Sequence, residues 1–144
     1  METILVSACL LGRCCKYSGG HNRNEAIIAF LRGRHYIPVC PESLVLPAPR
    51  PPVELHGGRV VTEDGRDLTA LYEKGVAETL ARLGGASVTL AILKARSPTC
   101  GSGEIYDGTF SHRRVPGDGL LARALKARGI PVRTEEDIAR LMED

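Results

Sequence analysis

Three of the five cysteines stand at or just after the end of an apolar segment. Cys9 ends ILVSAC, Cys40 ends YIPVC, and Cys100 closes ARSPTC after the run VTLAILK. Thiolates are soft ligands that select zinc, copper(I) or iron–sulfur centres. Three protein ligands leave one coordination position open, which a catalytic metal centre needs. The three cysteines are therefore candidate ligands of a catalytic metal centre.

The spacing of the cysteines does not by itself identify a metal motif. There is no C-x-x-C pair, and the C-x4-C-C spacing of Cys9, Cys14 and Cys15 is not that of a ferredoxin. Each cysteine alone, Cys9 above all, can also be a small core residue. Cys15 or Cys14 is a possible fourth ligand. The four histidines are scattered along the chain: His21, His35, His56 and His112.

Polar residues near these cysteines supply candidate acid–base groups. Glu42 follows Cys40 by two residues, and a carboxylate beside a metal-bound substrate can activate water. The alternative is that Glu42 caps a helix or is a solvated loop residue. Lys94 ends an apolar run, where its stem can also lie along apolar surface with the ammonium in water. Asp107, in IYDGTF, is a second candidate base.

The elements that carry these residues alternate along the chain. Short β-branched and apolar runs predict strands at 3–10, 35–40, 87–95 and 130–134. Apolar residues at helical spacing predict helices at 22–34, 67–85, 117–129 and 135–144. The expected helix caps are Asn24 or Asn22, Asp67 and Asp118, with a stop at Gly84.

Two long connections complete the chain. Residues 41–66 contain five prolines and predict a loop with a small hairpin at Gly57–Gly58. Residues 96–117 predict a glycine-rich loop. Alternating strands and helices favour a Rossmann-like α/β three-layer sandwich with a mostly parallel sheet, formed by one domain over 1–144. Ligands of such sheets bind beyond the carboxyl ends of the strands, where the three cysteines would meet.

Composition limits the classes of partner. Of the 144 residues, 43% are hydrophobic, 25% are charged and 4% are aromatic, with no Trp, and the net charge is +2. A nucleic-acid partner is therefore not expected, because neither a basic block nor an aromatic platform is present. No signal peptide and no apolar stretch near eighteen residues is recognised, so we expect a cytoplasmic protein whose thiols stay reduced.

Seven motifs follow one another along the chain: ILVSACLLG, PVCPE, PRPPVE, DGRDLT, AILKARSPTCG, IYDGTF and GDGLLARAL. In this order they resemble the motifs of the domain-of-unknown-function family 523. Its short single-domain members include thiouracil desulfidases, and the resemblance covers residues 4 to about 132. Two motifs differ from the family: SLVLPAP follows PVCPE instead of a glycine pair, and Ser18 stands where the family has Asp.

The resemblance implies a 4Fe–4S cluster held by Cys9, Cys40 and Cys100, with one iron free to bind the sulfur of the substrate. It also implies a glutamate and a serine beside the cluster, which match Glu42 and Ser97. Cys15 falls on a family cysteine position, whereas Cys14 does not. The implied activity is non-redox removal of sulfur from a small thiolated pyrimidine, giving a uracil product and hydrosulfide.

Several alternatives stay open. The chain could be a metal- or nucleotide-binding module without catalysis. A thiol redox enzyme using Cys14 and Cys15 is disfavoured, because adjacent cysteines rarely form a relaxed disulfide. Action on thiolated tRNA is disfavoured by the modest charge and the few aromatics. The position of the sulfur (C2 or C4), the form of the substrate (base, nucleoside or nucleotide) and the oligomeric state are not determined.

Overall fold

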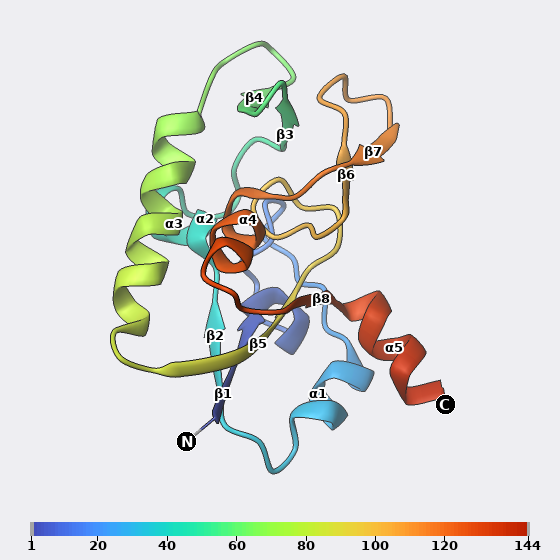
Figure 1. Ribbon diagram of the computed structural model, residues 1–144. Coiled ribbons are helices and arrows are strands. Elements are labelled where there is room, and N and C mark those ends of the chain that lie inside the picture. The colour runs from blue at the N-terminus through green and yellow to red at the C-terminus, as the bar shows by residue number, and fades with distance from the viewer. Residues whose placement is uncertain (1, 144) are drawn as a thin grey trace.

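Four parallel strands form the central sheet of the computed structural model, which describes residues 2–143. They are β1 (Glu2–Ser7), β2 (Tyr36–Val39), β5 (Ser87–Leu93) and β8 (Val132–Thr134), in the order β2-β1-β5-β8. Every neighbouring pair is parallel (Figure 1). The four predicted strands and the predicted parallel sheet are therefore confirmed.

Helices cover both faces of this sheet, as predicted for a three-layer sandwich. One face carries α3 (Thr69–Leu83) and α4 (Leu120–Ala127), and the other carries α1 (Glu25–Leu31) and α5 (Glu135–Glu143) (Figure 1). The side chains of β1 alternate between two apolar cores: Leu5 packs in the α3–α4 core, whereas Ile4 and Val6 pack in the α1–α5 core. None of the described helices is long and apolar enough to cross a membrane.

The helix ends follow the sequence in part. Asn24 is the N-cap of α1, as predicted, and its side chain accepts a hydrogen bond from the Ile27 amide. Gly84 ends α3, also as predicted. The prediction that Asp67 is the N-cap of α3 is wrong, because Leu68 holds that position. The Asp67 carboxylate instead accepts a hydrogen bond from the Thr69 amide.

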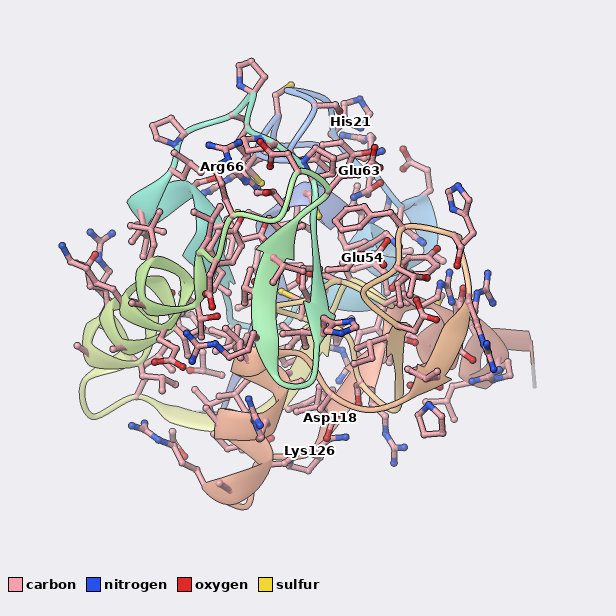
Figure 2. All side chains as sticks on the ribbon, turned by 90° about the horizontal axis from the view of Figure 1, so that it is seen from above. His21, Glu54, Glu63, Arg66, Asp118 and Lys126 are labelled. Atoms are coloured by element: carbon pink, nitrogen blue, oxygen red, sulfur yellow. The ribbon has the colours of Figure 1, made fainter. Side chains whose placement is uncertain are left out.

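The prediction that Asp118 caps α4 is also wrong, because Gly119 is the N-cap. A Cβ atom at Gly119 would lie 2.5 Å from the carbonyl carbon of Thr99, so the start of α4 packs tightly on the SPTCG turn. Asp118 instead accepts hydrogen bonds from the Gly103 amide and from Lys126, a pair visible at the edge of Figure 2.

The long connections contain the one hairpin that the sequence predicted and also three elements that it did not predict. After β1 comes a 3-10 turn, η1 (Ala8–Leu11), and after β2 comes α2 (Pro41–Val45). The hairpin predicted at Gly57–Gly58 is confirmed as β3 (Val53–His56) and β4 (Arg59–Thr62). The predicted glycine-rich loop contains a second antiparallel hairpin, β6 (Glu104–Tyr106) and β7 (Arg114–Pro116).

The strand order creates a crevice at the carboxyl ends of the strands. From β1 the chain passes to β2 on one side, and it then crosses over to β5 on the other side of β1. Because the connections after β1 and β5 leave in opposite directions, a crevice opens between them beyond their carboxyl ends. Figure 2 looks down on this end of the molecule, with the β3–β4 hairpin lying across the view.

Candidate metal centre

A cavity of about 540 Å³ lies beyond the carboxyl ends of the sheet. Seven residues selected from the sequence line it: Cys9, Cys15, Cys40, Glu42, Lys94, Ser97 and Cys100. The fold thus brings together residues that come from three connections far apart in the chain. Cys14 and Asp107 are not among the lining residues.

Cys9 and Cys40 reach the cavity from the turns that follow β1 and β2. Cys9 lies in η1, two residues after β1, and Cys40 is the N-cap residue of α2. The side-chain amide of Asn22 donates a hydrogen bond to the Cys9 sulfur over 3.4 Å, and the Ser43 hydroxyl donates one to the Cys40 sulfur over 3.1 Å. Both sulfurs therefore sit beside polar donors that stabilise a thiolate.

Cys15 is the neighbour that most affects the ionisation of these two thiols. Accepting a hydrogen bond from Cys15 is the main reason that the pKa of Cys9 falls to about 7 and that of Cys40 to about 6. The Asn22 and Ser43 hydrogen bonds lower these pKa values further. The pKa of Cys15 is raised, because loss of its proton would break its hydrogen bonds. Cys9 and Cys40 are thus the thiols poised to ionise.

Cys100 is held in the tight SPTCG turn after β5. The Ser97 hydroxyl oxygen accepts hydrogen bonds from the amides of Thr99 (3.2 Å) and Cys100 (3.1 Å). A Cβ atom at Gly101 would lie 2.8 Å from the Ser97 carbonyl oxygen, so only glycine fits there without a shift. Burial raises the pKa of Cys100, and a hydrogen bond with Ser7 opposes this effect. Cys100 would therefore ionise on binding a metal.

The three candidate ligands offer only sulfur as donor atoms. Cys9, Cys40 and Cys100 all line one cavity, but no group of three or more His, Cys, Asp or Glu side chains among the described residues is placed to hold one metal ion. Thiolates are donors that iron–sulfur clusters accept, so the chemistry of these three residues fits such a cluster.

Glu42 is held at both carboxylate oxygens. Its Oε1 accepts a hydrogen bond from the Thr99 hydroxyl over 2.9 Å, and its Oε2 accepts one from Arg50 Nη2 over 2.7 Å. The Arg50 side chain is 1% exposed and that of Glu42 is 16% exposed. Glu42 is thus neither a solvated loop residue nor a helix cap. It is a fixed carboxylate in the first turn of α2, at the cavity wall.

Lys94 is also fixed at the cavity, immediately after β5. Its amide donates to the Ser7 hydroxyl, and its Nζ forms an ion pair of 2.8 Å with Glu135 at the start of α5. Glu135 is buried and also accepts the Ala95 amide over 2.7 Å. Lys94 therefore does not extend freely into water, and its charge contributes to the lowered pKa of Cys9.

Asp107, the second candidate base, is engaged within its own loop. Its Oδ1 accepts hydrogen bonds from the amide (2.9 Å) and the hydroxyl (2.6 Å) of Thr109, which lower its pKa. The loop docks on β3, where Glu54 accepts the amides of Gly108 and Phe110. Glu54 and Phe110 line the cavity, and Figure 2 labels Glu54 beside the β3–β4 hairpin. Asp107 therefore shapes a loop at the cavity mouth and does not reach its wall.

The side chains that contact the candidate site and were not identified from the sequence include Asn22, Ser43, Arg50 and Thr99. Ser43 follows Cys40 by three residues, which is the spacing of an N-cap residue and its helix partner, and that signal was available. Thr99 precedes Cys100 directly. Nothing local marks Asn22 or Arg50, because their partners lie 13 and 8 residues away.

A family description matches most of the chain: the model of the 2-thiouracil desulfurase family covers residues 4–137. One curated relative, the uncharacterized protein YbbK of Bacillus subtilis (strain 168), is 40% identical over 146 residues. The alignment covers 94% of this chain and 97% of that protein.

A solved structure has the same fold. It is described as a [4Fe-4S]-dependent thiouracil desulfidase, TudS, and superposes with a TM-score of 0.86 at 38% sequence identity. The match covers 99% of this chain and 96% of that one. The likeness thus includes every segment that lines the cavity.

Proposed function

This chain belongs to the 2-thiouracil desulfurase family, and on that premise we propose that it is an iron–sulfur-dependent desulfidase that replaces the sulfur of a thiolated pyrimidine with oxygen. The family membership confirms the resemblance drawn from the sequence motifs. The observation that carries the proposal is the single cavity lined by Cys9, Cys40 and Cys100 together with Glu42 and Ser97.

Cys9, Cys40 and Cys100 are the proposed ligands of a 4Fe–4S cluster. Held by these three residues, such a cluster would have one iron without a protein ligand and would supply Lewis-acid activation of a thiocarbonyl group. The lowered pKa values of Cys9 and Cys40 support this assignment, because ligating cysteines must be thiolates. Cys15 has a raised pKa and is proposed to stay protonated as a hydrogen-bond donor to its neighbours.

Glu42 is the proposed general base. It takes a proton from water, and the water oxygen attacks the carbon that carries the sulfur. The carbon–oxygen bond forms, the carbon–sulfur bond breaks, and the sulfur leaves as hydrosulfide. Water supplies the oxygen, one of its protons leaves with the hydrosulfide and the other is released from Glu42 to solvent, so no electron donor and no ATP are consumed.

Ser97 and Lys94 have supporting roles in the proposal. The Ser97 hydroxyl oxygen already accepts two amide hydrogens, so its own hydrogen is free to donate to the substrate or to the attacking water. Lys94, held by Glu135, places a positive charge at the cavity wall, which favours the departure of an anionic sulfur species. Asp107 is kept as the reserve base, and Glu42 is preferred because it lines the cavity.

The test is anaerobic reconstitution of the protein with iron and sulfide, followed by a panel of pyrimidines. The panel contains 2-thio and 4-thio substrates, each as the free base, the nucleoside and the 5′-monophosphate. We expect a brown protein that releases hydrosulfide and the matching oxo-pyrimidine without a reductant. A brown protein that turns over none of the panel would contradict the desulfidase proposal. A colourless protein that binds zinc would instead indicate a metal-binding module.

A further inference from the structure

We propose that Arg50 is a positioning residue: its buried guanidinium fixes the carboxylate of Glu42 in the orientation from which it takes a proton. This inference rests on the proposed function, in which Glu42 is the base. It adds a residue that lies outside the set selected from the sequence.

Arg50 connects three separate pieces of chain at the cavity wall. Its Nη2 donates to Glu42 Oε2 over 2.7 Å and to the Cys15 carbonyl oxygen over 2.8 Å. Its Nη1 donates to the Leu46 carbonyl oxygen at the end of α2 over 3.4 Å. Its own amide donates to the Tyr17 carbonyl oxygen over 2.7 Å. The guanidinium therefore has one set of partners and cannot swing without losing several of them.

The burial of this pair is difficult to explain by stability alone. The side chain of Arg50 is 1% exposed, and its Nε has no hydrogen-bond partner among the described residues. Removing two charges from water is costly, and a buried ion pair often stabilises a fold no more than apolar residues of similar volume. The Arg50 guanidinium is, however, itself held by the carbonyl oxygens of Cys15 and Leu46, so the hydrogen bond from its Nη2 fixes the position of Glu42 Oε2. Orientation is thus the better explanation for a buried arginine at this place.

Arg50 and Thr99 hold Glu42 from two sides. Each carboxylate oxygen has two acceptor sites, so one hydrogen bond from Arg50 and one from Thr99 leave a site free on each oxygen. A free site is what a general base needs. Loss of Arg50 would free one oxygen and allow the carboxylate to rotate about the Thr99 contact, which is enough to displace the base from the water.

The test compares Arg50→Met and Arg50→Lys with Arg59→Met as the matched control. Arg59 also pairs with a carboxylate, Asp67, over 2.9 Å, but the pair is exposed and neither residue lines the cavity. All variants are reconstituted, matched for iron content and measured by steady-state kinetics, which give kcat and KM, and by single-turnover kinetics, which give the rate of the chemical step. Misplacing a catalytic group by about 1 Å can cost about 100-fold in rate.

We expect Arg50→Met to lose about 10- to 100-fold in kcat with little change in KM, and Arg59→Met to match the native rate. Arg50→Lys keeps the positive charge but loses the separate Nη1 and Nη2 donors of the guanidinium, so it should recover part of the loss in kcat. A raised KM with an unchanged kcat would overturn the inference, because it would mean that Arg50 binds substrate directly.

A second comparison asks whether Arg50 acts through Glu42. In a Glu42→Gln background, Arg50→Met should change the remaining rate by less than about twofold, because residues that act as a unit are not additive. The double variant also removes both charges of the pair, which protects its folding. An equal loss in both backgrounds would overturn the inference.

A third readout needs no activity. In a crystal structure of the metal-free Arg50→Met protein, the Glu42 carboxylate should leave the position that it has in the native protein. If native protein and panel give no desulfidation while Glu42 moves in this variant, the proposed function fails and the positioning role stands. If Glu42 keeps its position in Arg50→Met, the positioning role fails whatever the activity.

Discussion

Two segments of the molecule each begin with a candidate cysteine ligand, but the carboxylates that they carry have different partners. Cys40 opens the segment that contains α2 and ends at Arg50, and Cys100 opens the segment that contains the β6–β7 hairpin. Each places a carboxylate a few residues beyond a candidate ligand: Glu42 in the first and Asp107 in the second. By sequence Glu42 is the first candidate base, two residues after Cys40, and Asp107 is the reserve, seven residues after Cys100.

The difference between the segments lies in the partners of these carboxylates. Glu42 binds residues from other parts of the chain, Arg50 and Thr99, and is mostly buried at the cavity wall. Asp107 binds Thr109, two residues away, and stabilises its own loop. The contacts of Glu42 therefore join distant parts of the chain at the cavity, whereas those of Asp107 stay within one loop.

The largest expected effect concerns the cysteines that open the two segments, where the segments should behave alike. Cys40→Ser and Cys100→Ser, together with Cys9→Ser, should each abolish turnover and cut iron retention, because a hydroxyl is a poor ligand for iron in a cluster. The measurement is iron and sulfide per protein after anaerobic reconstitution. Cys14→Ser, which changes an exposed residue outside the cavity, is the control and should keep its iron.

The next effect separates the two carboxylates. Glu42→Gln should lose roughly two to four orders of magnitude in single-turnover rate, because the amide cannot accept the proton. Asp107→Asn should keep the rate within about threefold, a small part of what a positioned base contributes. Both variants are compared at equal iron content. A normal rate in Glu42→Gln together with a collapse in Asp107→Asn would reverse the comparison and make Asp107 the base.

A smaller effect should appear in the metal-free protein. The pKa of Cys40 is about 6 and that of Cys100 is raised, so at neutral pH Cys40 is mostly thiolate and Cys100 is thiol. Only the thiolate is alkylated readily, and Cys100 is also buried. Iodoacetamide should therefore label Cys40 at least about tenfold faster than Cys100, as followed by peptide mass spectrometry. Similar labelling rates would mean that the two segments do not differ in this way.

The smallest effect concerns stability and pH. The folded-state pKa of Asp107 lies below its ordinary value, because the ionised form accepts the Thr109 hydrogen bonds. Its contribution to stability is therefore present above the unfolded pKa and is lost as the pH falls through the lower folded-state value. Asp107→Asn should melt slightly below the native protein at neutral pH, and the two melting curves should converge in strong acid. A difference that grows on acidification would contradict this assignment.

The sequence predicted the strands of the sheet better than it predicted the short elements in the connections between them. The four sheet strands were predicted because each is an apolar run, with both faces of β1 buried. In contrast, α2 has five residues and β6 and β7 have three each, which is too short for a helical or alternating pattern to emerge. Gly75 allows α3 to pack on α2, since a Cβ atom there would lie 2.3 Å from the Pro41 carbonyl oxygen. Pro41 at the first position of α2 also favours a helix start, and the packing on α3 stabilises a helix of only five residues.

The sequence alone determined the alternation of strands and helices, the parallel sheet and hence the convergence of Cys9, Cys40 and Cys100 at one end of it. These properties depend on apolar periodicity and on the position of each cysteine after a strand, both of which are local. Only the tertiary structure showed that Glu42 lines the cavity and Asp107 does not, introduced Arg50 and brought Cys15 beside two thiols. Those outcomes depend on burial and on hydrogen bonds between segments that meet only after folding. The local sequence pattern of each segment does not predict these contacts.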